Sequence, residues 1–199
     1  MGALSQILAG FGLSAASGLN AYIPLLLVGL TARFTPWLQL SPPFDALTNG
    51  WVLGVLVVLE LIELFVDKIP GLDHLNDLIQ TIVRPTAGAI LFAANAHVIT
   101  NLDPIIAVVL GLVVAFGVHT TKAAARPFVT AGTFGLGNWL VSIIEDVISV
   151  VLSVLALVAP ILLIFLFALA ALFLMRWWSR RRASQTAPAA ASASVKWPR

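Results

Sequence analysis

The chain has 199 residues, of which 10% are charged and 60% are hydrophobic, and its mean hydropathy is +1.01. A soluble domain carries about 25% charged residues, so this composition excludes an ordinary soluble protein and predicts an integral membrane protein. Because the chain contains no cysteine, disulfides, thiolate metal sites and cysteine nucleophiles are excluded as well.

The long apolar runs favour transmembrane helices over a β-barrel, because short segments of alternating polarity are absent. We predict an all-α polytopic fold of about six spans, each near the ~20 apolar residues that cross a bilayer. In chain order the expected spans are 4–32, 51–66, 72–99, 103–118, 139–159 and 160–175. One helix over 139–178 is the alternative to the last two spans, although its length of ~60 Å exceeds the bilayer.

Three stretches depart from simple spans. The first span is interrupted by Ser14, Ser17, Asn20 and Pro24, which indicate either a broken helix or close helix packing. Residues 119–138 are small, polar and glycine-rich, and we expect a surface or re-entrant segment there. Residues 179–199 have low complexity and are expected to form a disordered cytoplasmic tail behind a membrane domain of residues 1–178.

The basic residues predict the orientation. With the C-terminus in the cytoplasm, every one of the eleven Lys and Arg residues except Arg33 falls inside. Both termini are then cytoplasmic, and the expected location is the bacterial cytoplasmic (inner) membrane.

The span count also predicts internal symmetry. Six spans divide into halves of about 1–100 and 101–178, and an odd number of spans in each half requires opposite orientations. An inverted repeat with broken helices is a common transporter construction. Faint similarity agrees, since 10–12 resembles 115–117, and Trp51 and Trp139 each open the second helix of a half.

Charged residues inside the spans point to function, because charge is costly in a bilayer. Glu60 and Glu63 share one face of the second span with Asp67. Glu60 lies ~10 Å from the predicted cytoplasmic end of this helix. A carboxylate at this depth is protonated, paired or metal-bound, with a structural ion pair as the simpler reading. Arg84, inside the third span and followed by Pro85, needs a partner, for which Glu60 or Glu63 is nearest in depth.

A basic stripe and a second acidic pair follow. His119, Lys122 and Arg126 repeat the i, i+3, i+7 spacing, which indicates either a topology signal or an anion site in which Arg126 binds in a bidentate way. Glu145, with Asp146 beside it, reaches a similar depth on the fifth span. These two adjacent acids cannot point the same way, so one is expected to pair with a basic residue.

We therefore predict one shared polar site for a substrate or ion between the halves. The residues expected to line it are Asn20, Glu60, Glu63, Arg84, Lys122, Arg126, Glu145 and Asp146. Asp73 and Asp77 are metal-site candidates at i, i+4, although acids in the first turns of a helix also suit its macrodipole. No catalytic motif is present, so no catalytic residue is predicted.

Three stretches carry a resemblance to one family: residues 12–22 (GLSAASGLNAY), residues 63–73 with the run Asp67-Lys68-Ile69-Pro70, and residues 122–146 with Arg126-Pro127. Over roughly residues 5–165 the chain resembles the bacterial domain-of-unknown-function family 4126. The resemblance implies a small bacterial polytopic membrane protein. It carries no established activity and no functional residues.

Three functions remain open at this point. The first is a transporter or channel for a small solute or ion that uses the buried carboxylate and arginine site. The second is an intramembrane metal-dependent enzyme acting on a lipid phosphate, and the third is a structural or assembly subunit. The expected partners are the lipid bilayer and the solute or ion; neither a cofactor nor nucleic acid is expected, and a homo-oligomer stays open.

Overall fold

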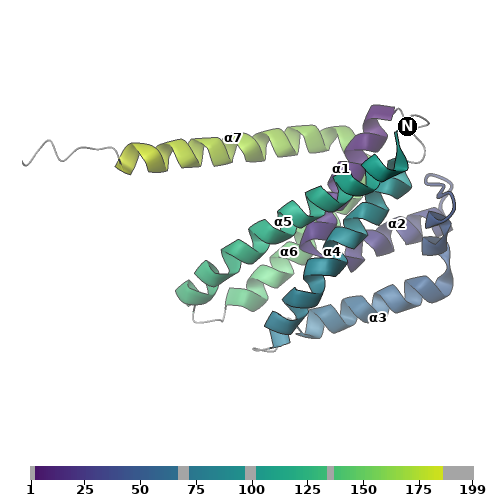
Figure 1. The fold of residues 1–199 in the computed structure, drawn as a ribbon, viewed down its shortest axis with the longest axis horizontal. Coiled ribbons are helices and arrows are strands. Elements are labelled where there is room, and N and C mark those ends of the chain that lie inside the picture. Colours follow the sequence, from purple (N-terminus) through teal and green to yellow (C-terminus); the bar gives the residue numbers. More distant parts are fainter. Residues whose placement is uncertain (1–2, 67–71, 97–101, 134–136, 186–199) are drawn as a thin grey trace, which may run out of the picture. The chain divides into compact units, whose positions relative to one another are not determined.

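The chain folds into helices joined by short connections (Figure 1). The computed structural model describes residues 3–66, 72–96, 102–133 and 137–185, and it contains no strand in these ranges. The helices are α1 Ala3–Leu19, α2 Tyr22–Phe34, the 3-10 helix η1 Phe44–Thr48, α3 Gly50–Val66, α4 Leu72–Ala96, α5 Pro104–Thr133, α6 Gly137–Val158 and α7 Pro160–Gln185. The predicted all-α class is confirmed.

Residues 1–163 form one compact unit, and residues 164–199 form a second. In the first unit, α1 is the central helix and packs against α4, α5 and α6. Small residues allow this close approach: a Cβ at Gly18 would lie 2.6 Å from the carbonyl oxygen of Ala115. The Ser14 hydroxyl donates a hydrogen bond of 2.9 Å to the carbonyl oxygen of Gly88. Close packing, one of the two readings of these residues, is therefore observed.

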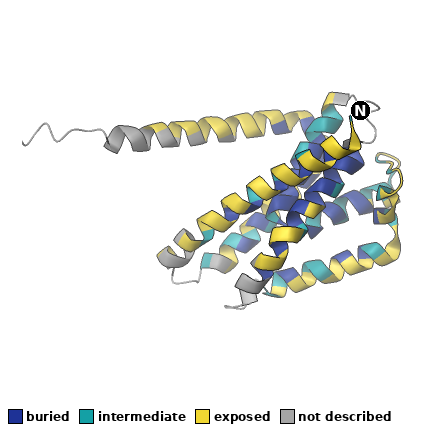
Figure 2. Ribbon diagram, in the orientation of Figure 1, coloured by how far each residue is buried: buried dark blue, intermediate teal, exposed yellow. Residues whose placement is uncertain are grey.

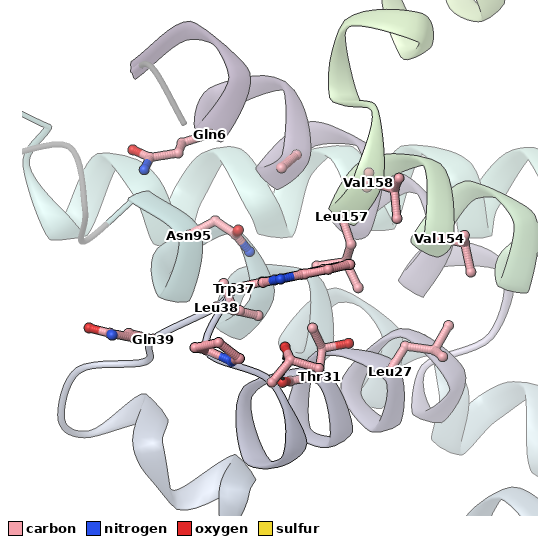
Figure 3. A pocket seen from close by; sticks show the side chains of 14 residues that line it. Gln6, Leu27, Thr31, Trp37, Leu38, Gln39, Asn95, Val154, Leu157 and Val158 are labelled. Carbon is pink, nitrogen blue, oxygen red and sulfur yellow. Dashed lines mark hydrogen bonds between the residues drawn. The ribbon is translucent and has the colours of Figure 1, made fainter.

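The chain breaks its helix at Asn20 and reverses direction. The Asn20 Oδ1 accepts hydrogen bonds from the backbone N–H groups of Tyr22 at 2.9 Å and Ile23 at 3.1 Å, which satisfies free donors at the start of α2. The start of α1 and the end of α2 line one pocket, to which Gln6 and Thr35 both contribute (Figure 3). A straight helix would separate these two residues by roughly 40 Å. Helices α1 and α2 therefore form a helical hairpin with its tip at Asn20–Ala21.

This hairpin corrects the first predicted span. Residues 4–32 form two helices that return to the same end of the unit, so they are not a single crossing. The start of α1 and the end of α3 at Val66 therefore lie at opposite ends of the unit. The sequence prediction had placed the N-terminus and the loop after α3 on the same, cytoplasmic side. The inverted repeat, which was predicted from three spans in each half, stays a prediction.

The second and third predicted spans correspond to α3 and α4, and α4 continues through Pro85. The predicted end of the fourth span at residue 118 is wrong, because α5 runs unbroken to Thr133. Most described side chains of 119–127 are exposed, as expected for a surface segment, and residues 134–136 lie outside the described residues. Alanine is the strongest helix former, and three of them, 123–125, lie in this stretch. The small residues there extend a helix instead of ending one.

The last two predicted spans are separate helices. Helix α6 ends at Val158 and α7 begins at Pro160, as expected from a proline that favours the first turn of a helix. The predicted disordered tail begins too early, because α7 continues to Gln185. The remainder of that tail, 186–199, lies outside the described residues.

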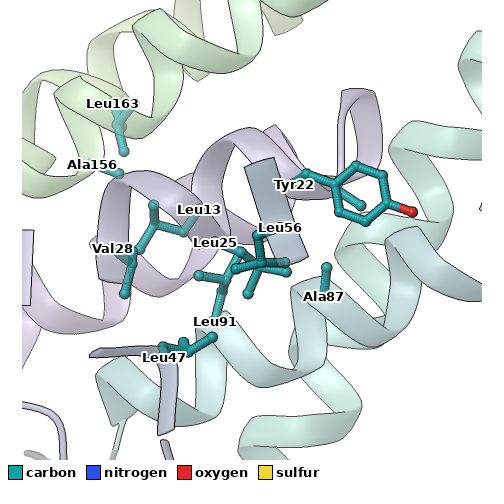
Figure 4. Close-up of a cluster of buried hydrophobic side chains, with 11 residues drawn as sticks. Leu13, Tyr22, Leu25, Val28, Leu47, Leu56, Ala87, Leu91, Ala156 and Leu163 are labelled. Atoms are coloured by element: carbon teal, nitrogen blue, oxygen red, sulfur yellow. The ribbon is translucent and has the colours of Figure 1, made fainter. Parts of the chain in front are cut away.

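An apolar core fills the first unit around the hairpin (Figure 4). It contains Leu13, Tyr22, Leu25, Val28, Leu47, Leu56, Ala87, Leu91, Ala156 and Leu163. Many apolar residues are also exposed, and exposed residues follow the outer side of α5 (Figure 2). Two stretches, Pro104–Pro127 and Trp139–Val158, are long and apolar enough to cross a membrane. These features favour association with a membrane.

Candidate functional site

Charged and polar side chains from four helices surround the hairpin tip. We call this group the central cluster; it contains Asn20, Glu60, Glu63, Arg84, His119, Lys122, Glu145 and Asp146. Helix α3 supplies two of the acids, α4 the arginine, α5 the histidine and lysine, and α6 the other two acids. Seven of the eight site residues predicted from the sequence thus come together, and all belong to the first unit.

Asn20 connects the two acidic helices. Its Nδ2 donates to Glu60 Oε1 at 3.2 Å and to Asp146 Oδ1 at 3.0 Å. An amide nitrogen carries two hydrogens, so these two bonds use its full donor capacity. With Oδ1 bound to the start of α2, every polar atom of this side chain has a partner, and its position is fixed from three directions.

Arg84 is the most deeply buried charge of the cluster, with a side chain 1% exposed. Its Nη2 donates to Glu63 Oε1 at 2.6 Å, and its Nη1 lies 3.3 Å from His119 Nδ1. Because a guanidinium only donates, Nδ1 is the accepting nitrogen. The proton of the imidazole then lies on Nε2, which faces the hydroxyl oxygen of Thr81 at 3.1 Å. This arrangement corresponds to a neutral His119.

Lys122 joins the end of α1 to α6. Its Nζ lies 2.7 Å from Glu145 Oε2 and donates to the carbonyl oxygen of Leu19 at 3.1 Å. A cation at a helix C-terminus binds carbonyls that have no partner within the helix and complements the macrodipole. The prediction that one of the adjacent acids pairs with a basic residue is confirmed for Glu145, while Asp146 faces Asn20.

Buried polar atoms of this region without a hydrogen-bond partner among the described residues include Glu60 Oε2, Gln80 Oε1 and Arg84 Nε. Gln80, 1% exposed, lies beside Tyr22, whose surroundings also include Glu60, Glu63 and Arg84. Buried polar groups in native proteins bind protein, water or ligand. These atoms therefore mark where the cluster has capacity for something further.

The other predicted residues have different outcomes. Arg126 is half-buried one turn after Lys122, whose electrostatic environment it shares, so it lies at the edge of the cluster. Asp73 and Asp77 lie in α4, but their side chains are outside the described part of the chain. Within that part, no three His, Asp or Glu side chains gather closely enough to hold a metal ion.

Sequence reasoning left Gln80, His119 and Tyr22 out of the predicted site. Gln80 shares a helical face with Arg84, and His119 shares one with Lys122. This helical spacing could have indicated that both residues belong to the site. Tyr22 is the single tyrosine of the chain and follows the break at Asn20. Its position beside the cluster depends on the reversal of α2, which the spacing does not reveal.

Two cavities flank the hairpin. The larger, of about 670 Å³, lies between the start of α1 and the end of α2 and is lined by neutral groups, among them Asn95 and Trp37 (Figure 3). A groove of about 460 Å³ lies along α5 and reaches Lys122 and Glu145. The two arms of the hairpin lead from the larger cavity to the tip. They contribute Leu13, Leu25 and Val28 to the apolar core (Figure 4).

Comparison with known proteins identifies a family but no activity. The model of the domain of unknown function DUF4126 matches residues 7–181, so the chain belongs to this family. Neither a curated protein nor a solved structure matches the chain. The site must therefore be interpreted from its own chemistry.

Proposed function

We propose that this member of an uncharacterised family is an integral membrane transporter or channel that moves a small solute or ion through the central cluster. The observation that carries the proposal is the hairpin tip, where Asn20 links partly buried carboxylates of α3 and α6. Intramembrane charge is expensive and marks substrate or ion pathways. Helix breaks that present helix ends to a polar site are a transporter feature.

The exposed apolar surface favours a lipid bilayer as the environment of the protein. Ile105, Val109 and Val113 on α5, and Val147 and Val151 on α6, are exposed. A contiguous apolar surface of this kind fits lipid or a partner protein. We place the protein in the bacterial cytoplasmic membrane with the cluster toward the cytoplasm, because Lys122 and Arg126 lie at that end and Arg33 at the other. The start of α1 then faces outward.

The arrangement also suggests how a path is closed. The larger cavity and the cluster lie at opposite ends of the hairpin, and leucine and valine side chains of both arms fill the space between them. Passage therefore requires the hairpin to move relative to α4 and α6. Asn20, which holds the tip to α3 and α6, is positioned to couple occupancy of the cluster to that movement.

The ion pairs favour this function over an assembly subunit. In the third sequence hypothesis the buried charges pair with a partner helix, but Arg84 and Lys122 pair with Glu63 and Glu145 of the same chain. The cluster is thus complete without a second protein. One oxygen of Glu60 accepts from Asn20 and one oxygen of Glu63 accepts from Arg84, so each carboxylate is already bound by a donor of the chain.

Ion flux into vesicles tests the proposal. Purified protein is reconstituted into liposomes that contain a pH-sensitive or a sodium-sensitive dye, and protons, Na⁺, K⁺ and Cl⁻ are offered in turn under an imposed potential. We expect flux of at least one ion above that of protein-free vesicles. Glu60→Gln should abolish it, and Asp45→Asn, which changes an exposed acid, should not. Folded wild-type protein that moves none of these ions would refute ion transport through the central cluster.

A further inference from the structure

We propose that Glu60 takes up and releases a single proton at the hairpin tip, where its carboxylate and that of Asp146 bind the same Asn20 amide nitrogen. This inference deepens the proposed function, on which its transport role rests, by naming the proton as the ion. Three features support it: the geometry of Asn20, the charges near Glu60, and the buried oxygen atoms that lack partners.

The two carboxylates converge on one atom. Glu60 Oε1 and Asp146 Oδ1 lie 3.2 Å and 3.0 Å from the same Asn20 Nδ2. The two oxygens are therefore at most about 6 Å apart, within the range at which like charges oppose each other's ionisation. Protonation of one carboxyl group removes this repulsion. The neutral acid still accepts the Asn20 hydrogen bond through its carbonyl oxygen.

The titratable and charged groups around Glu60 come from several helices. Tyr22 on α2, Glu63 on α3 and Arg84 on α4 lie nearest, together with Asp146 on α6. Helix α5 adds His119, Lys122 and Arg126, and α6 adds Glu145. The Arg84 charge is held by Glu63 at 2.6 Å and the Lys122 charge by Glu145 at 2.7 Å. The nearest cations are thus each bound to a carboxylate other than Glu60.

The partnerless atoms favour a proton over a metal cation. Glu60 Oε2 and Gln80 Oε1 are buried acceptors, and Arg84 Nε is a buried donor of the same region. Hard cations such as Ca²⁺ and Mg²⁺ need about six oxygen ligands, and among the described residues no three His, Asp or Glu side chains gather closely enough to hold a metal ion. A proton needs one oxygen to carry it. On release, the O–H bond of Glu60 breaks, the electron pair stays on the oxygen, and the proton passes to water at the cytoplasmic end.

Infrared spectroscopy of the detergent-purified full chain tests the assignment without relying on transport. Wild-type protein in D₂O and in H₂O is titrated with pH while the carbonyl stretch of protonated carboxylic acids is recorded. We expect one band from a buried acid that loses its intensity as the pH rises and shifts with deuteration. Glu60→Gln should remove this band, whereas Asp45→Asn, a control acid that is exposed, should leave it unchanged.

A second variant covers the case in which Glu60→Gln does not fold. Glu60→Asp keeps the carboxyl group, and its band should remain but at a displaced frequency. A wild-type protein without such a band, or a band that Glu60→Gln or Glu60→Asp leaves unaltered, overturns the inference. Failure of the proposed function is a different result: the band then responds to Glu60→Gln, but vesicles show no ion flux. Flux together with an unresponsive band leaves transport standing and removes Glu60 as the proton carrier.

Discussion

Removing the Arg84 guanidinium should destabilise the protein more than most single changes. The side chain is 1% exposed, and its Nη2 lies 2.6 Å from Glu63 Oε1. Arg84→Met deletes the charge but keeps an apolar chain in the space, so the loss of packing is small. The Glu63 carboxylate, 5% exposed, then loses its ion-pair partner. Breaking one side of a buried pair costs about 3–5 kcal/mol of folding free energy.

The partner variant completes a double-mutant cycle. Glu63→Gln removes the other charge and should also destabilise, because Arg84 then lacks its counter-charge. In the double variant neither charge remains, so the combined loss should be smaller than the sum of the single losses by about 2–3 kcal/mol. Arg33→Met is the matched control: Arg33 is exposed and donates to the Thr48 carbonyl. Its loss should stay below about 1 kcal/mol.

Reversible unfolding of the four variants in mixed detergent micelles, followed by circular dichroism, measures these free energies. The essential quantity is the interaction between the two substitutions. If the single losses add without interaction, or if Arg84→Met costs no more than Arg33→Met, the ion pair does not stabilise the fold and the account of the cluster given above is wrong.

Three further predictions concern the packing of the helices and the hairpin. Gly88→Ala should cost about 1–3 kcal/mol, because a Cβ there would lie 2.8 Å from the Gly111 carbonyl oxygen. Gly117→Ala, which meets nothing within 4 Å, should be neutral or stabilising; equal effects in the unfolding assay would contradict the packing. Asn20→Leu removes the hydrogen bonds at the start of α2 and both carboxylate bonds, and should cost about 2–4 kcal/mol; a loss within error would show that they contribute nothing. Cysteines placed at Gln6 and Thr35 in this cysteine-free chain should be joined by a short bifunctional reagent, since both line one cavity; if each cysteine reacts but no cross-link forms, the two helices are not a hairpin.

The convergence of the charged residues was predictable because its cause is local. An acid or an arginine within an apolar helix must face a partner, and helical spacing gives both its face and its depth. These two quantities left Glu60 and Glu63 as the nearest partners of Arg84 in depth, and the structure pairs Arg84 with Glu63. The same reasoning separated Glu145 from Asp146, since consecutive residues on a helix point in different directions.

The reversal at Asn20 was not predictable in this way. A polar break inside a long apolar stretch is compatible with a kinked span and with a hairpin, and local propensity does not distinguish them. The outcome depends on packing: Gly12 and Gly18 let α1 approach α5 and α6 closely, while α2 packs against α3, α4 and α6. These contacts join residues far apart in the sequence, and apolar periodicity reports only that a face is buried, not which helix buries it.

The hairpin also explains why opposite charges separate at its tip. Helix α1 ends there with free carbonyl groups, and one of them, that of Leu19, binds the Lys122 ammonium at 3.1 Å. Helix α2 begins there with free N–H groups, which Asn20 satisfies while its amide nitrogen holds Glu60 and Asp146. Cations suit the negative end of a helix and anions the positive end. A straight helix across residues 4–32 would place neither of its ends beside these charged residues. The tip therefore stabilises a cation beside the end of α1 and anions beside the start of α2. Protonation or ionisation of Glu60 acts directly on its hydrogen bond with Asn20, which holds the tip in place.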